Sequence, residues 1–187
     1  MVWNLPNTLT WLRIFAIPLV VVLYTLPYRW SDPAAGLLFA AAGITDSLDG
    51  YFARKFGQTS KLGAFLDPVA DKLIVAAALI VLVQLGRTDA IVAAIVIGRE
   101  ITISALREWM AGIGASRSVA VSLLGKIKTV AQMVAIPMLL YYEEFLGIDC
   151  RLLGSWLMWV AALLTLWSMG YYLRMAWPEI AARSKDH

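Results

Sequence analysis

The sequence predicts an all-α integral membrane protein with six transmembrane helices and an N-terminal interfacial segment. Composition supports this fold class, because 60% of the 187 residues are hydrophobic and only 16% are charged, against about 25% in a soluble domain. Apolar stretches also recur along the chain, each near the ~20 residues that cross a hydrocarbon core as a helix. These stretches cover residues 9–29, 34–52, 63–86, 89–110, 119–142 and 153–176.

The six stretches use almost the whole chain, so residues 1–187 are predicted to form one membrane-embedded domain. Ahead of the first stretch, residues 4–10 alternate polar and apolar side chains. Pro6, followed by Thr8 or Thr10 as a cap, suits the entry to a helix. We therefore expect residues 4–10 to lie at the membrane interface.

Basic residues are divided unevenly between the two sets of connections. The connections after the second, fourth and sixth stretches, with the nearby helix ends, contain Arg54, Lys55, Lys61, Arg117, Lys126, Lys128, Arg174, Arg183 and Lys185. The opposite connections contain only Arg29, Arg87 and Arg151. The positive-inside rule then predicts that both termini are cytoplasmic. Because the basic residues follow a membrane rim and form no stripe, a nucleic-acid partner is disfavoured.

Four aspartates fall within the second and third predicted membrane helices, where ionisable groups are costly and usually functional. Asp46 and Asp49 are three residues apart, and Asp67 and Asp71 are four apart, so each pair shares a helix face. If the two helices are antiparallel neighbours, counting ~1.5 Å per residue from their connection puts the two pairs at matching depths. The spacing predicts one carboxylate pocket open to the cytoplasm.

Oxygen ligands alone are available to this pocket. The single histidine, His187, is the last residue, and the single cysteine, Cys150, falls at the opposite side of the membrane. Clustered carboxylates in a low dielectric need protons or cations to neutralise them. Their oxygens favour two divalent ions of the Mg²⁺ or Mn²⁺ type. Asp71, at the far end of the cluster, is our candidate for the general base that deprotonates an alcohol.

The residues beside the aspartates suit a second, anionic ligand. Gly50, Ala53 and Gly63 have minimal side chains that let a ligand approach the helix backbone closely. Arg54, at the mouth of the pocket, is suited to a phosphate. A carboxylate-relay ion transporter explains the membrane aspartates as well. It does not explain the small residues and the arginine around them.

The run Asp46-x2-Asp49-Gly50-x2-Ala53-Arg54-x8-Gly63-x3-Asp67-x3-Asp71 resembles the signature of the CDP-alcohol phosphatidyltransferase family at eight positions over 26 residues. The resemblance implies that family's six-helix membrane fold, usually a homodimer, with a CDP-lipid and two metal ions in a cytoplasmic cavity. It assigns metal coordination to all four aspartates and the role of base to Asp71. It assigns contacts with the CMP moiety to Asp49, Gly50, Ala53, Arg54 and Gly63.

Basic residues outside this run indicate an anionic acceptor. Arg99 lies about ten residues inside the fourth predicted span and needs a partner there. Glu100 and Arg107 are seven apart and share a helix face, although Arg99 and Glu100 also suit an internal ion pair. Lys126 and Lys128 are two apart and point in nearly opposite directions on a helix. We expect at most one of the two lysines, together with Arg99 and Arg107, at the acceptor phosphate.

The segments 4–13, 99–108 and 125–129 are similar to those of bacterial family members that act on glycerol 3-phosphate. This similarity implies CDP-diacylglycerol and sn-glycerol 3-phosphate as substrates, and phosphatidylglycerophosphate and CMP as products. It also implies the bacterial inner membrane as the location. Inositol phosphate, serine and phosphatidylglycerol are the alternative acceptors within the family.

Overall fold

The structure is a computed structural model that describes residues 5–56, 61–114 and 123–183. Side chains are described in these ranges except at residues 5–10, 46–56, 61–65, 123, 124, 126, 179, 182 and 183. The described chain forms six helices and one short hairpin, which confirms the predicted all-α class. The elements are α1 (Leu5–Thr25), α2 (Ser31–Phe56), α3 (Lys61–Gln84), α4 (Ala90–Gly112), α5 (Leu123–Tyr141), β1 (Glu144–Phe145), β2 (Ile148–Asp149) and α6 (Cys150–Arg183).

Local sequence explains where several helices begin and end. Asp89 caps α4, because its side chain accepts a hydrogen bond from the Ile91 amide at 2.7 Å. Asp149 likewise accepts from the Leu152 amide at 2.9 Å at the start of α6. Gly86, with a φ of +66°, lets the chain leave α3 through the left-handed region. The predicted interfacial segment is continuous with the first helix, because α1 already begins at Leu5.

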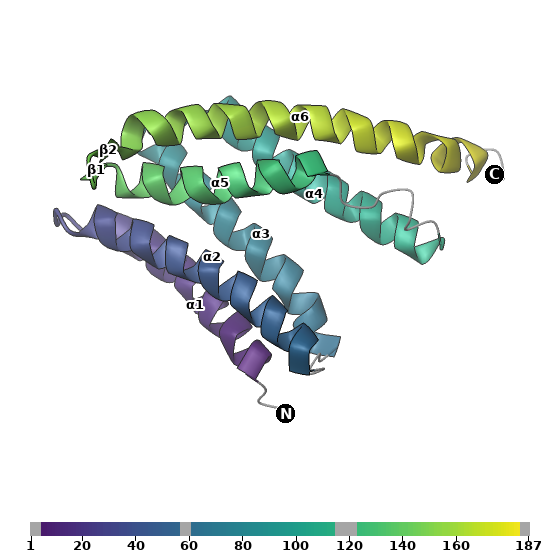
Figure 1. The fold of residues 1–187 in the computed structure, drawn as a ribbon, viewed down its shortest axis with the longest axis horizontal. Coiled ribbons are helices and arrows are strands. Elements are labelled where there is room, and N and C mark those ends of the chain that lie inside the picture. Colours follow the sequence, from purple (N-terminus) through teal and green to yellow (C-terminus); the bar gives the residue numbers. More distant parts are fainter. Residues whose placement is uncertain (1–4, 57–60, 115–122, 184–187) are drawn as a thin grey trace.

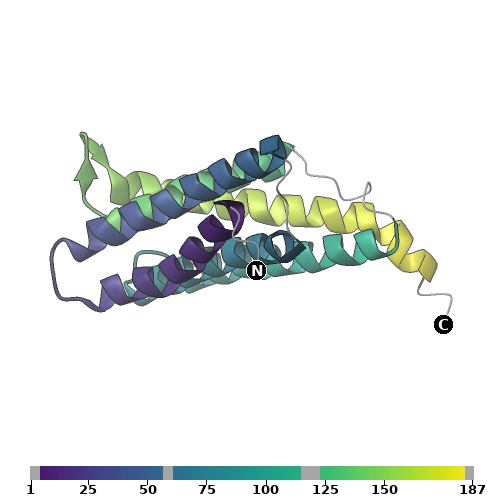
Figure 2. The same ribbon diagram turned by 90° about the horizontal axis from the view of Figure 1, so that it is seen from below.

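The six helices close into a ring in which α2 packs on α1, α1 on α3, α3 on α4, α4 on α6, α6 on α5, and α5 on α2. A further contact between α3 and α5 crosses the ring. The helices lie close together where α1 meets α2 and α5 meets α6, and they splay apart toward the other end (Figure 1). In both views α4 and α6 extend beyond α2 and α5 at the splayed end (Figure 2).

Arg87 ties the narrow end of the bundle together. Its guanidinium forms an ion pair with Asp32 of α2. It also donates to the carbonyl oxygens of Leu139 and Leu140 at the end of α5, at 3.3 and 2.9 Å. The Tyr142 ring lies 4.1 Å from the guanidinium carbon. One side chain thus satisfies the last carbonyl groups of α5, which the helix itself leaves unpaired.

The apolar core fills the narrow half of the molecule. Its largest cluster takes residues from the second halves of α3 and α5 and from the first halves of α4 and α6, which all lie toward that end. Among its members are Leu79, Leu82, Val96, Ile136, Leu139 and Met158. A smaller cluster of Ile103, Met110, Tyr172 and Ala176 joins α4 to α6 in their extended parts. The polar side chains of the interior therefore lie in the space between the splayed helices.

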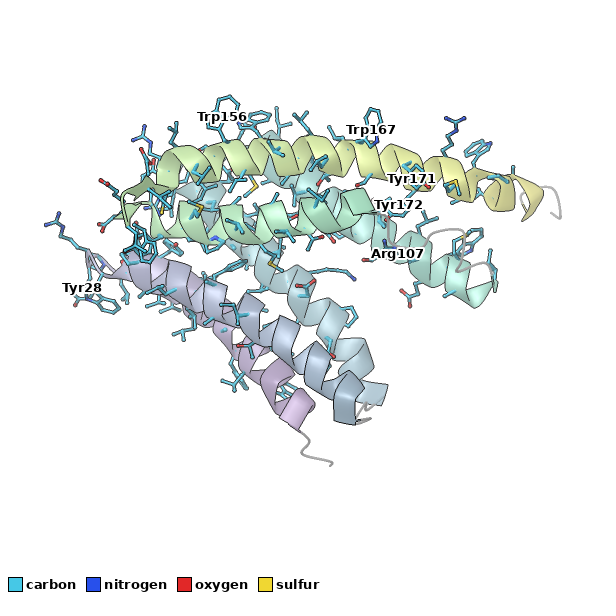
Figure 3. The ribbon with its side chains drawn as sticks, in the orientation of Figure 1. Tyr28, Arg107, Trp156, Trp167, Tyr171 and Tyr172 are labelled. Carbon is cyan, nitrogen blue, oxygen red and sulfur yellow. The ribbon has the colours of Figure 1, made fainter. Side chains whose placement is uncertain are left out.

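The outside of the bundle is apolar, as a lipid-facing surface requires. Trp156 and Trp167 are 66% and 71% exposed and project outward from α6 (Figure 3). By length and hydropathy, α6 is the one described helix able to cross a membrane, over Cys150–Pro178. Trp11–Thr25 and Ile127–Tyr141 form shorter apolar helices. Charged residues such as Asp71 and Arg99 lower the hydropathy of the other helices, so six crossings remain a prediction.

Candidate functional site

A polar cavity of about 610 Å³ lies between α3, α4 and α5 in the splayed half of the bundle. Helix α3 contributes Asp71 and Lys72, and α5 contributes Thr129 and Gln132. Helix α4 contributes the strip Arg99, Glu100, Ser104, Arg107 and Glu108. The expected polar strip on α4 therefore does face the interior of the bundle.

A second, mainly apolar cavity of about 550 Å³ lies between α2, α3 and α5. Its walls include Phe39 and Ile44 of α2 and Val134 and Met138 of α5. Asp71 lines this cavity as well as the polar one. The carboxylate of Asp71 thus stands where a polar space and an apolar space meet.

The assumption behind the depth estimate, that the second and third helices are neighbours, stays a prediction. In the described part of the chain, α2 packs on α1 and α5, while α3 packs on α1, α4 and α5. Ile44 of α2 and Asp71 of α3 border one cavity that lies between these two helices. Helices that hold a ligand between them need such a space.

The predicted site residues are only partly within the described side chains. Asp67 and Asp71 are half-buried and lie one turn apart on α3. The side chains of Asp46, Asp49, Gly50, Ala53, Arg54, Gly63 and Lys126 lie outside the described residues, although all of these positions are helical. Whether the four carboxylates meet thus remains a prediction.

The polar cavity has a network of charges along one wall. Glu100 accepts from Arg99 at 3.3 Å and forms an ion pair with Lys128 of α5. Arg99 also donates to the Ser168 hydroxyl of α6 at 3.3 Å. Lys128 is 1% exposed, so its charge is compensated inside the protein. The internal ion pair considered for Arg99 and Glu100 is therefore present.

Arg107 lies near the end of α4, and its environment differs from that of Arg99. It lines the polar cavity, and its Nε has no hydrogen-bond partner among the described residues. The buried Tyr172 ring of α6 lies 5.2 Å from the Arg107 guanidinium and 5.8 Å from that of Arg99. Figure 3 shows Tyr172 turned from α6 toward Arg107. The ring attracts both cations and holds them side by side.

Sequence analysis missed two residues of this site. Gln132 is 4% exposed, lines the polar cavity, and carries an Oε1 without a hydrogen-bond partner. Tyr172 contacts both arginines from a helix 65 residues later in the chain than Arg107, by the difference of the two residue numbers. A glutamine inside an apolar helix was a visible signal for Gln132. No sequence signal pairs Tyr172 with α4.

The donor chemistry of the aspartates fits a hard divalent cation. Asp67 and Asp71 offer oxygen ligands four residues apart on one face of α3. Among the described side chains no group of three or more potential ligands comes together. A complete coordination shell therefore needs contributions from beyond these residues, and positions 46 and 49 of α2 are the carboxylates that the sequence offers.

A helical bundle with an apolar exterior, and with acidic and basic groups around an internal cavity, defines an enzyme class that works on charged substrates beside lipid. The CDP-alcohol phosphatidyltransferase family matches residues 3–167. The chain belongs to this family.

Curated relatives from Escherichia coli (strain K12), Shigella flexneri serotype 5b (strain 8401) and Salmonella choleraesuis (strain SC-B67) are each 47% identical over 182 residues. These matches cover 94% of this chain and 96% of each relative. Each relative is a CDP-diacylglycerol–glycerol-3-phosphate 3-phosphatidyltransferase.

Proposed function

We propose that the protein transfers the phosphatidyl group of CDP-diacylglycerol to sn-glycerol 3-phosphate, giving phosphatidylglycerophosphate and CMP. The name shared by its 47% identical relatives supports this reaction. The structural observation that carries it is the position of Asp71, which lines both the polar and the apolar cavity. A transferase that joins a lipid to a water-soluble phosphate needs one carboxylate at such a junction.

The apolar cavity suits the lipid substrate. Phe39, Ile44 and Val134 form walls that an acyl-glycerol portion can contact. Position 46 follows Gly43 by three residues on α2, so both positions share a helix face, and Gly43 lines this cavity. This spacing supports a pyrophosphate close to Asp46 and Asp49. The CMP moiety then contacts Asp49, Gly50, Ala53, Arg54 and Gly63.

The polar cavity suits the anionic acceptor. Arg107 offers a guanidinium that no described carboxylate pairs, and Arg99 stands beside it on the Tyr172 ring. Guanidinium groups bind phosphate through paired, charge-assisted hydrogen bonds. Lys128 is engaged by Glu100, so we assign it to support of the cavity wall. Lys126, two residues away, stays a candidate for the acceptor phosphate from the sequence alone.

In the reaction, one bond to phosphorus forms and one breaks. Asp71 takes the proton from the C1 hydroxyl of glycerol 3-phosphate, and that oxygen attacks the phosphorus next to diacylglycerol. The bond between this phosphorus and the bridging oxygen breaks, and CMP leaves with the electron pair. Holding both reactants at Asp71 supplies much of the rate by positioning.

Two divalent ions, Mg²⁺ or Mn²⁺, are proposed at Asp46, Asp49, Asp67 and Asp71. When bound, such ions neutralise charge on the pyrophosphate and stabilise the leaving oxygen. The oxygen-only donors on α3 support this choice. Without cations, four carboxylates gathered in one pocket would repel one another.

We further propose that residues 1–187 form one domain that crosses the bacterial inner membrane six times, with both termini and the active site on the cytoplasmic side. The alternation of helix direction supports this topology, because the two chain ends and the splayed helix ends lie away from the narrow end (Figure 1). The family resemblance supports a homodimer. Transport by a carboxylate relay is disfavoured by membership of a transferase family.

An acceptor screen with the purified protein tests the proposed reaction. CMP release from CDP-diacylglycerol is measured with glycerol 3-phosphate, inositol phosphate, serine and phosphatidylglycerol, each with and without Mg²⁺ or Mn²⁺. We expect release only with glycerol 3-phosphate and metal together. Release with another acceptor instead would assign the protein to a different reaction of the same family.

Replacement of Asp71 tests the base. Asp71→Asn keeps the size of the side chain but cannot accept the proton, so we expect turnover to fall by about 10²-fold or more. Glu143→Gln, at an exposed position beside the hairpin, is the control that leaves the pocket untouched. Normal turnover in Asp71→Asn would exclude Asp71 as the base.

A further inference from the structure

Gln132 is a buried polar residue that the reaction described so far does not use. It lies on α5 within the polar cavity and is 4% exposed. Its Oε1 has no hydrogen-bond partner among the described residues. A buried carboxamide oxygen without a partner costs free energy, and such atoms in folded proteins usually have an explanation.

The neighbours of Gln132 show that packing alone does not require an amide here. Met133 and Ile136, next to it and one turn on, are apolar and partly or fully buried. An apolar side chain of the same length would fill this position without leaving a polar atom unpaired. The carboxamide is therefore best explained by a polar ligand in the cavity.

Which part of a ligand reaches Gln132 depends on where Arg107, Asp71 and Gln132 lie along the cavity. Arg107 is five residues from the end of α4, at the splayed end of the bundle. Gln132 lies nine residues inside α5, which begins at that same end. Asp71, on the α3 wall, borders the same cavity. Arg107 therefore lies at the mouth of the cavity, and Gln132 and Asp71 lie on two walls of its inner part.

We infer that Gln132 binds the non-reacting C2 hydroxyl of the acceptor and selects for acceptors that carry it. This inference rests on the proposed function. With the acceptor phosphate at Arg107 and the C1 hydroxyl at Asp71, the middle carbon lies between the two walls. A hydroxyl both donates and accepts hydrogen bonds, so it satisfies either end of the carboxamide. Gln132 is thus a specificity-determining residue and takes no part in the proton transfer.

The test compares two acceptors that differ only in this hydroxyl. The acceptors are sn-glycerol 3-phosphate and 3-hydroxypropyl phosphate, which lacks the C2 hydroxyl. The wild-type protein should show the higher kcat/KM with glycerol 3-phosphate. Gln132→Met keeps the length of the side chain and removes its polar atoms, so it should reduce that preference by about tenfold or more. Its kcat/KM with 3-hydroxypropyl phosphate should change little.

Two controls separate this role from a structural one. Gln84→Met makes the same chemical change at an exposed position at the end of α3, and it should keep the full preference. Gln132→Asn retains the amide one carbon further back and should give an intermediate preference, which keeps the test decisive if Gln132→Met does not fold.

The outcomes for the inference and for the proposed function differ. Equal losses with both acceptors in Gln132→Met, or an unchanged preference, would overturn the role of Gln132 while leaving the reaction established. A wild-type protein inactive with glycerol 3-phosphate would remove the proposed function and this inference together.

Discussion

Glu100 stands between two buried cations and shows how a single residue keeps the acceptor cavity intact. Lys128 and Arg99, 1% and 7% exposed, both contact its carboxylate. An ion inside a protein costs several kcal/mol unless a partner compensates it. Glu100 therefore supports the positions of both cations. Arg107 has no such carboxylate partner among the described side chains, and we propose that it meets the substrate.

Glu100→Gln should destabilise the protein because it leaves Lys128 buried without an opposite charge. Breaking a buried pair from one side typically costs about 3–5 kcal/mol. Unfolding in detergent, followed by circular dichroism against temperature and denaturant, measures the loss. Glu144→Gln, at an exposed position in the short hairpin, should change stability by less than about 0.5 kcal/mol.

The double variant Glu100→Gln with Lys128→Met removes both charges of the pair and should recover part of the lost stability, because no unpaired charge is left at position 128. Equal stability of wild type and Glu100→Gln would show that the pair contributes nothing to the fold. Lys128 would then again be available for the acceptor phosphate.

At the scale of elements, close packing of α2 on α5 depends on Gly36. A methyl group at this position would stand 2.9 Å from the Tyr141 amide nitrogen and 3.0 Å from the Pro137 carbonyl oxygen, both backbone atoms of α5. Neither atom moves without shifting the helix. Small residues allow this approach of helix backbones, as in membrane helix pairs generally.

Gly36→Ala should therefore lower stability by about 1–3 kcal/mol, because it forces α2 and α5 apart. Gly98→Ala is the matched control, since nothing lies within 4 Å of the added methyl group on α4. That change should be neutral or stabilise by up to about 1 kcal/mol through helix propensity. Thermal unfolding of the two variants in the same detergent compares them, and equal effects would contradict the packing argument.

Helix α6 reaches the acceptor site through Tyr172, which contacts Arg99 and Arg107 with its ring. Tyr172→Leu should raise KM for glycerol 3-phosphate by about tenfold, as expected from two cation–π contacts of ~0.5–1 kcal/mol each. KM for CDP-diacylglycerol should stay unchanged. Tyr172→Phe keeps the ring, so its KM for glycerol 3-phosphate should equal that of the wild type. A raised KM in this variant would show that the hydroxyl, and not the ring, is needed.

The neighbouring Tyr171 provides the control for this test. It is 48% exposed and its ring lies 5.8 Å from the Tyr172 ring, whereas among the described aromatic rings Arg99 and Arg107 contact only that of Tyr172. Tyr171→Leu should leave KM for both substrates at the wild-type value. An equal rise in KM for glycerol 3-phosphate in the Tyr171 and Tyr172 variants would exclude the positioning role of Tyr172.

The helices themselves were predictable because long apolar stretches and their breaks are local features. Each described helix overlaps one predicted stretch, and the spacing of Glu100 and Arg107 correctly indicated a polar face of α4 turned toward the bundle. The order of helices around the ring was not predictable, since it depends on close contacts such as that of Gly36 with α5. For the same reason Tyr172, which belongs to the site only through the packing of α6 on α4, was missed.

For the molecule as a whole, the two ends of the bundle have different tasks. The apolar core and the Arg87 contacts fix the narrow end, whereas the polar cavity lies among the splayed helices and the apolar cavity extends from Asp71 toward Phe39 and Met138. Because the narrow end is fixed, the helices can stand apart at the other end while the protein stays folded. Substrates from the cytoplasm need access to the splayed end, so the proposed orientation in the membrane follows from the position of the cavities.

Cysteine labelling tests this orientation in cells. Cys150 is the only cysteine and is buried, so Cys150→Ala gives a background without thiols. Tyr28→Cys and Leu146→Cys add exposed thiols at the narrow end, and Ala111→Cys adds one at the splayed end. A membrane-impermeant maleimide should label the first two in cells with a permeable outer membrane. It should label Ala111→Cys only after the inner membrane is opened.

The reverse pattern would place the splayed end outside the cell, where neither a CDP-lipid nor glycerol 3-phosphate is supplied by metabolism. Labelling of all three positions from one side would instead show that the bundle does not cross the membrane. Only the expected pattern agrees with three features at once. These are the direction of the helices, the excess of basic residues near the splayed end, and the access of the acceptor to Asp71. The accessibility of position 111 therefore decides whether the cavity that contains Asp71 opens toward its substrates.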